Sequence, residues 1–516
     1  MKFLGFSFVA GLVAALGFEP LGFWPLTILG FAGLMWLVFA ASSLRSALAR
    51  GWWFGVGHFT LGLNWIATAF TYQSAMPAWL GWIAVVLVSL YLATYPAMAA
   101  GLAWRWGADG ARGRRDGMRF ILLFAAAWII TEWLRSAMFT GFAWNPVGVA
   151  FVDTRFADFA RVIGTYGVSG ATLLFSGMIM LLVAEPRRKR LIWVGVALAG
   201  AVMIAHFTRG EPLAAPDLPV RIVQPNIGQQ DKWREGFEER NFARLRRLSG
   251  QAGEEPRLLL WPEAAVTDPL QDERANPYYG RQAEQLRERV GRIIGPRDLL
   301  LTGGITFQSK NGVKVTSATN SVFAMDHRGR ILGRYDKAHL VPYGEYLPAR
   351  PILSRLGLSR LAPGSVDFGS GPGPRTLALP LVGEVGFQVC YEIIFSGHVV
   401  DPANRPAFIF NPSNDAWFGA WGPPQHLAQA RMRALEEGLP VLRSTPTGIS
   451  AVIDADGRLL HSLPWRTAGA IDARLPPPKP PTLFAQMGNV LPFVFALLLI
   501  LIAIGSERIA ASRKGR

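Results

Sequence analysis

The sequence predicts an α/β domain inserted between the seventh and eighth spans of an eight-helix membrane bundle. Hydrophobic residues make up 51% of the 516 residues and charged residues only 17%, which is typical of a membrane protein. Basic residues cluster between alternate apolar segments, as in a multi-pass topology. Residues 208–487 differ from the rest, because they combine mixed charge with the short apolar runs of a soluble domain.

The apolar segments come first along the chain. A membrane span needs roughly 20 mostly apolar residues. Lys2 followed by an apolar run also fits a signal peptide, but further spans follow at once, so we interpret it as an uncleaved signal anchor. The predicted spans are residues 3–18, 21–41, 51–72, 78–104, 118–137, 162–184, 190–207 and 488–505.

The net charge of +16 indicates topology rather than nucleic-acid binding. Short loops near residues 18–20 and 72–77 carry no basic residue, whereas the alternate connections and the C-terminal tail are basic. This pattern predicts cytoplasmic termini, with residues 208–487 and the loop near 138–161 on the outer face. The basic residues are Arg45, Arg50, Arg105, Arg112, Arg114, Arg115, Arg119, Arg187, Arg188, Lys189, Arg190, Arg508, Arg513, Lys514 and Arg516.

The chain therefore divides into a transmembrane domain (residues 1–207), an extracytoplasmic domain (208–487) and a last span with a cytoplasmic tail (488–516). Proline-rich linkers flank the middle domain, at residues 212–219 and 476–481. Apolar runs alternate with amphipathic patterns, which predicts an α/β domain. Strands are predicted at 220–224, 258–261, 299–303, 321–325, 386–391, 408–410 and 450–454, and helices at 237–248, 279–294 and 426–437.

Cys390 is the only cysteine, so no intramolecular disulfide can form. A free thiol outside the cytoplasm is open to oxidation, whereas Ala or Val would fill a core position without that risk. A chemical role is therefore favoured over the alternative, an inert buried cysteine at a strand end.

Three motifs place ionisable side chains near predicted strand ends, where open sheets tend to form sites. They are Trp261-Pro262-Glu263, the segment 335–346 with Lys337, and the Cys390 run. A thiol, a carboxylate and an amine suit acyl transfer: the thiolate attacks a carbonyl, a shielded carboxylate takes the thiol proton, and the ammonium stabilises the oxyanion. The alternative is a structural ion pair between Glu263 and Lys337.

In this order, the motifs resemble those of the nitrilase superfamily, which uses a Glu-Lys-Cys triad on an α-β-β-α sandwich. With seven spans before the domain and one after it, the whole chain resembles the apolipoprotein N-acyltransferase family. The most specific pieces are Trp261-Pro-Glu263, residues 335–348, Cys390-Tyr-Glu392 and residues 414–418.

The resemblance implies a role for each matching residue. Glu263 would be the general base, Lys337 the oxyanion residue and Cys390 the nucleophile. Supporting carboxylates would be Glu345 and Glu392, and the pocket would be shaped by Trp233, Asn320, Tyr391 and Trp417.

The resemblance also implies partners and a location. The acyl donor would be a phospholipid, the acceptor the amino group of a lipoprotein's N-terminal diacylglyceryl-cysteine, and the intermediate a thioester. We expect a monomer in the bacterial inner membrane, with the catalytic domain on the periplasmic or outer face, and no cofactor, metal or nucleic acid.

Other interpretations remain open. A membrane-tethered nitrilase-type amidase would share the triad, but a soluble amide needs no bundle. A transporter would need paired broken helices at the bilayer midplane, and the spans show none. Trp144, on the outer side, either contacts lipid substrate or belongs to an aromatic belt. Polar residues in or near spans serve either function or helix packing: His58, Asn64, Glu132 and His206.

Overall fold

The computed structural model describes residues 2–72, 77–107, 116–184, 210–357, 359–361 and 366–512. The chain forms two compact units. One comprises Met1–Ala67, Gly81–Gly210 and Pro481–Arg516, and the other comprises Thr68–Leu80 and Glu211–Pro480. The predicted span 190–207 lies outside the described residues, as do the basic clusters at 112–115 and 187–190 and the tail from residue 513.

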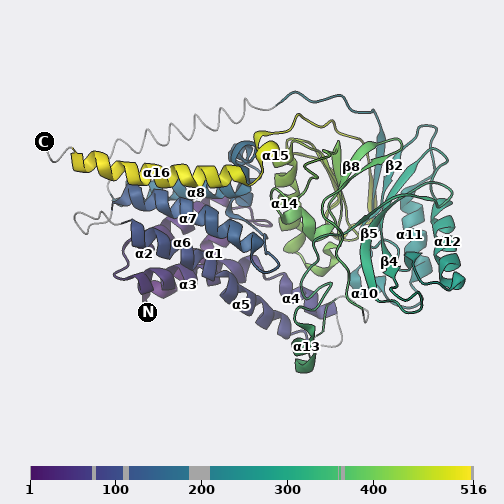
Figure 1. Ribbon diagram of the computed structural model, residues 1–516, viewed down its shortest axis with the longest axis horizontal. Helices are drawn as coiled ribbons and strands as arrows, with labels where there is room; N and C mark the ends of the chain where they lie inside the picture. Colours follow the sequence, from purple (N-terminus) through teal and green to yellow (C-terminus); the bar gives the residue numbers. More distant parts are fainter. Residues whose placement is uncertain are drawn as a thin grey trace. The chain divides into compact units, whose positions relative to one another are not determined.

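The first unit is helical (Figure 1). In the described part of the chain, three helical stretches are long and apolar enough to cross a membrane: Leu80–Trp106, Gly117–Ala137 and Arg155–Val183. They coincide with the predicted spans 78–104, 118–137 and 162–184. The helices of this unit are α1 (Lys2–Ala15), α2 (Trp24–Phe39), α3 (Leu44–Gly62), α5 (Leu80–Leu92), α6 (Thr94–Trp106), α7 (Gly117–Ala137), α8 (Ala160–Ala184), α15 (Leu483–Met487) and α16 (Val490–Ser512).

The second unit contains two β-sheets. The seven-stranded sheet has the order β13-β1-β2-β4-β5-β6, with β3 also paired to β4, and the six-stranded sheet has the order β12-β11-β10-β9-β8-β7. The first sheet consists of β1 (Pro219–Gln224), β2 (Leu258–Leu260), β3 (Pro269–Asp272), β4 (Leu299–Gln308), β5 (Ser317–Met325), β6 (Ile331–Asp336) and β13 (Gly469–Arg474). The second consists of β7 (Thr376–Leu379), β8 (Gly383–Phe387), β9 (Phe408–Pro412), β10 (Val441–Ser444), β11 (Ala451–Ile453) and β12 (Leu459–Ser462).

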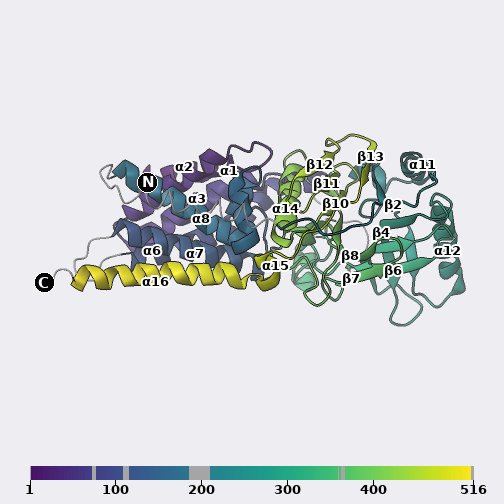
Figure 2. The same cartoon turned by 90° about the horizontal axis from the view of Figure 1, so that it is seen from above.

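Helices cover the outer faces of both sheets, which gives four α-β-β-α layers (Figures 1 and 2). One apolar core joins the two sheets, with Ile222 and Leu260 from the first packed with Phe387 and Phe410 from the second. Another core lies between the first sheet and its two helices, α11 (Glu238–Ser249) and α12 (Pro277–Gly291). The opposite outer face is covered by α14 (Gly422–Glu437).

The predicted strands and helices of this unit match observed elements, with one error that bears on the site. The strand predicted at 386–391 ends at Phe387, and residues Cys390–Ile394 form a short 3₁₀ helix instead. Cys390 has φ +54°, a left-handed conformation that no strand accommodates. Strands β3, β6, β7, β10, β12 and β13 were not predicted.

Candidate active site

The three candidate catalytic side chains follow the ends of strands from both sheets. Glu263 comes after β2, Lys337 directly after β6, and Cys390 shortly after β8. Pro262 ends β2, because proline has no N–H to donate to the ladder. The Glu263 loop then crosses β4 so closely that a Cβ on Gly303 would lie 2.6 Å from the Cα of Glu263. Position 303 must therefore be glycine for this loop to sit where it does.

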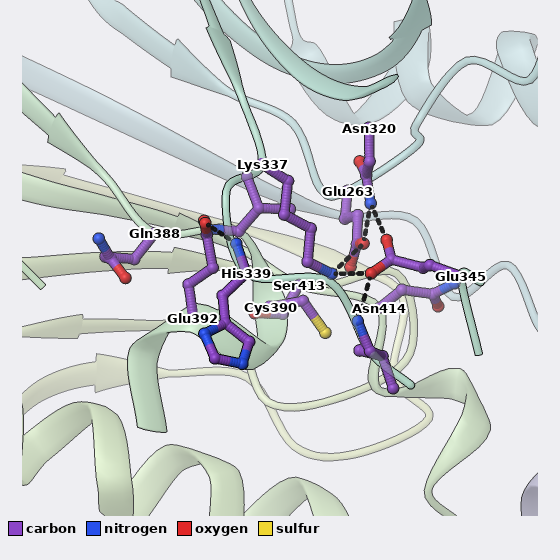
Figure 3. Close-up of polar contacts among 12 residues, drawn as sticks. Glu263, Asn320, Lys337, His339, Glu345, Gln388, Cys390, Glu392, Ser413 and Asn414 are labelled. Atoms are coloured by element: carbon purple, nitrogen blue, oxygen red, sulfur yellow. Dashed lines mark hydrogen bonds and ion pairs between the residues drawn. The ribbon is translucent and has the colours of Figure 1, made fainter. Parts of the chain in front are cut away.

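Lys337 is the centre of a buried ionic cluster (Figure 3). Its Nζ lies 2.9 Å from Oε2 of Glu345 and 3.8 Å from Oε1 of Glu263, and its side chain is only 1% exposed. Asn320 Nδ2 donates to both carboxylates, at 2.6 Å to Glu263 and 2.9 Å to Glu345. The cluster thus holds one ammonium between two carboxylates, with an amide fixing the distance between the carboxylates.

The electrostatics of the thiol differ from those of the ammonium. Burial raises the pKa of Cys390 well above its usual value, and the charge of Glu263 raises it further, against the lowering effects of Lys337 and the Asn414 backbone N–H. Burial disfavours the charged form of Lys337 too, but Glu345 and Glu263 outweigh it and raise the pKa of Lys337. The resting site therefore contains a neutral thiol and a permanent cation, so a base is needed to form the thiolate.

Glu392 ties the Cys390 turn to the segment after Lys337. Its Oε2 accepts from the N–H of Val389 at 2.6 Å, and its Oε1 accepts from the N–H of Ala338 at 2.6 Å and from Tyr335 Oη at 2.9 Å. Burial raises the pKa of Glu392 to about 7, although Lys337 and these backbone donors oppose that rise. Its arrangement is that of a positioning group rather than a reacting one.

The predicted aromatic residues lie in different environments. Tyr391 is buried, with its ring 5.2 Å from that of Phe395. Trp233 directly follows α10 (Gln229–Lys232) and is 41% exposed. The half-buried ring of Trp417 lies 5.9 Å from the ring of Tyr72.

Trp144 belongs to the helical unit, where its side chain is 0% exposed and its ring lies 4.5 Å from that of Trp65. A ring buried in this way packs inside the helical unit and presents no surface to lipid. The expectation that Trp144 contacts a lipid substrate, and the alternative that it belongs to an aromatic belt, both stay predictions.

Two features of the site were not anticipated from the sequence. Lys232 is buried, donates to the backbone oxygen of Glu263 at 3.1 Å, and has its pKa lowered to about 8 by burial. His426, Asp415 and Arg443 form a fully buried polar network beneath Cys390. Of these residues, only Asp415 falls within a motif singled out from the sequence. No local sequence pattern indicates that Lys232, His426 and Arg443 are buried.

Family comparisons cover most of the chain. Residues 10–178 match the family described as apolipoprotein N-acyltransferase N-terminal domain, and residues 220–479 match the family described as carbon-nitrogen hydrolase. The second match agrees with the four-layer α/β architecture.

Similar curated proteins span nearly the full length. An apolipoprotein N-acyltransferase of Rhodopseudomonas palustris is 32% identical over 97% of this chain and 95% of that protein. One of Caulobacter vibrioides is 35% identical over 98% of this chain and 94% of that protein. Among solved structures, an amidase from Nesterenkonia sp. AN1 covers 54% of this chain and 96% of its own, with 16% identity and a TM-score of 0.34. Saccharomyces cerevisiae Nit3 covers 50% of this chain and 90% of its own, with 18% identity and a TM-score of 0.36.

Proposed function

The chain belongs to the apolipoprotein N-acyltransferase family, and from this we propose that Cys390, Glu263 and Lys337 carry its chemistry. The protein transfers an acyl chain from a phospholipid to the N-terminal amino group of the diacylglyceryl-cysteine of a lipoprotein. The acyl group passes through a thioester on Cys390. The observation that carries the assignment is the single buried thiol beside one ammonium and two carboxylates.

The first half-reaction loads the enzyme. The Glu263 carboxylate takes the thiol proton, and Sγ attacks the ester carbonyl of the phospholipid. Lys337 stabilises the oxyanion that forms, since its charge does not depend on a proton transfer in this step. The S–C bond forms, the ester C–O bond breaks, and the lysophospholipid oxygen leaves with the proton held by Glu263.

The second half-reaction consumes the thioester. The neutral α-amine of the diacylglyceryl-cysteine attacks the thioester carbonyl and gives a proton to Glu263. The N–C bond forms, the C–S bond breaks, and the proton passes to the departing Sγ. Glu345 and Asn320 would keep Glu263 and Lys337 at a fixed separation throughout.

We further propose that the chain has eight spans, with the catalytic domain inserted between the seventh and the eighth on the periplasmic or outer face of the inner membrane. The basic clusters between alternate spans and the three described apolar helices support this arrangement. A reporter active only outside the cytoplasm should be active when fused at Pro478 and inactive after Arg516. The reverse pattern would contradict the topology.

The function is tested with the full-length protein in detergent and a phospholipid of one defined acyl chain. Intact mass should show one added acyl group, which neutral hydroxylamine removes because thioesters are labile to it. The Cys390→Ser variant is the control and should carry no such adduct. Adding a diacylglyceryl peptide should discharge the adduct onto its amine. Ammonia release from amides, with no adduct from phospholipid, would instead support the amidase interpretation.

A further inference from the structure

His426 joins the two chain segments that meet at the thiol. It lies on α14 with a side chain that is 0% exposed. Its Nε2 is 3.0 Å from the backbone oxygen of Cys390, and its Nδ1 is 2.9 Å from Oδ1 of Asp415. One segment is the Cys390 turn after β8, and the other is the loop after β9, which contains Asp415.

The direction of the contact with Cys390 follows from its chemistry. A carbonyl oxygen only accepts, so Nε2 must carry the hydrogen and donate it. Nδ1 has a partner in either protonation state, because Asp415 Oδ1 can accept from it and Arg443 Nη2, at 3.1 Å, can donate to it. The ring is therefore held on both sides with one orientation.

The far side of the network is also connected to the Cys390 turn. Arg443 on β10 donates to Oδ2 of Asp415 at 2.7 Å and to Ser413 Oγ at 2.9 Å, and it also donates to the side chain of Asn411. Asn411 in turn donates to the backbone oxygen of Gln388 at 2.5 Å, two residues before the cysteine. Arg443 and Asn411 therefore tie the loop after β9 to the Cys390 turn by a second route.

The Cys390 turn needs such support. A non-glycine residue at φ +54° is strained and persists only where its surroundings over-determine it. His426 contacts the loop after β9 through Asp415. The same loop places the N–H of Asn414 beside the Cys390 thiol, and this N–H lowers the pKa of the thiol. Holding the Cys390 oxygen and the Asp415 carboxylate on one ring therefore fixes the backbone of the Cys390 turn relative to the loop that contains Asn414.

We infer that His426 is a positioning residue for the nucleophile, which acts by donating from Nε2 to the backbone oxygen of Cys390 while Asp415 and Arg443 orient its ring. This inference rests on the proposed role of Cys390 and deepens it. Its essential component is the hydrogen bond to the carbonyl, not an imidazole proton transfer. A side chain that supplies the same donor should therefore replace histidine.

Two substitutions test the contacts of the two ring nitrogens separately. In His426→Gln the amide nitrogen reaches the place of Nε2 and keeps the donor to Cys390. In His426→Asn it reaches only the place of Nδ1 and keeps the contact with Asp415. Arg431→Gln is the matched control, because Arg431 lies on the same helix and donates to a backbone oxygen, that of Gly457, at 2.9 Å.

The experiment measures the single-turnover rate of acyl-enzyme formation from phospholipid by intact mass, on full-length variants whose melting temperatures are recorded. We expect H426Q and the control to stay within about 3-fold of the unmodified protein. We expect H426N to be about 10- to 100-fold slower at saturating phospholipid, with the half-saturating concentration unchanged, since a displacement near 1 Å is enough for such a loss.

Equal rates for H426N and H426Q would overturn the inference, as would an H426Q rate more than about 10-fold below that of the unmodified protein. If H426N does not fold, the rate of H426Q alone tests the inference. If the unmodified protein itself forms no adduct, the proposed function fails rather than the role of His426.

Discussion

Replacing Lys337 by arginine tests whether this residue stabilises an oxyanion or only neutralises carboxylates. The substitution keeps the positive charge but changes a compact ammonium into a planar fork. The side chain is 1% exposed and its Nζ lies 2.9 Å from one carboxylate and 3.8 Å from another, so the cluster has no room to spare. The larger head group must therefore shift itself or the carboxylates.

The expected loss follows from that shift. A displacement of about 1 Å at a reacting centre lowers the rate on the order of 100-fold. Removing an oxyanion donor altogether, as in Lys337→Met, lowers it by about 100- to 1000-fold. The Met variant should also lose about 3–5 kcal/mol of stability, because Glu263 and Glu345 would be left buried without their cation. The Arg variant should keep most of that stability.

The assay is the rate of hydroxylamine-labile acyl-enzyme formation in the Arg and Met variants, together with their melting temperatures. A folded Lys337→Arg variant with near-normal acylation would refute the oxyanion role and leave only charge neutralisation. Low activity in a stable Arg variant, with low activity and low stability in the Met variant, would support the two roles together.

Two further substitutions test the groups around Glu263. Glu263→Gln should block acylation by phospholipid yet leave Cys390 open to iodoacetamide, since losing the carboxylate's charge lowers the pKa of the thiol; normal acylation would move the base role to Glu345. Burial lowers the pKa of Lys232 from 10.5 to about 8, so above pH 8 the folded protein has released a proton that the unfolded chain keeps up to about pH 10.5. The contribution of Lys232 to stability should therefore rise by about 3 kcal/mol across that window and be lowest below pH 8. Lys232→Met should remove the rise, and an unchanged pH dependence of the melting temperature would contradict it.

The sequence was most informative where periodicity and chemistry coincide. Short apolar runs located β1, β2 and β9, and amphipathic spacing located α11, α12 and α14, because each element buries one face. The carbon-nitrogen hydrolase match supports the α/β fold predicted for this region. The roles assigned to Glu263, Lys337 and Cys390 stay predictions until the variants are measured.

Periodicity was least informative where long-range contacts decide the structure. The strand predicted through Cys390 was wrong, since the left-handed residue there is held by the distant His426 and Asn411 as well as by the nearby Glu392. The burial of Lys232 likewise depends on the loop at Glu263, 31 residues away. No local pattern encodes such pairings, and exposed strands such as β12 lack the alternation that would reveal them.

Burial keeps the Cys390 thiol neutral until a base takes its proton, and it also protects the thiol from oxidation. A thiolate is the form that oxidants attack, and the pKa of Cys390 is raised by burial and by Glu263, so the resting sulfur is a thiol that is only 5% exposed. In the proposed location outside the cytoplasm, a free cysteine survives best in this state. The thiolate would then form only when Glu263 takes the proton with a phospholipid ester in place. A thiol of raised pKa beside a base therefore becomes reactive only at the moment of acyl transfer. This arrangement is compatible with a free cysteine in an oxidising compartment.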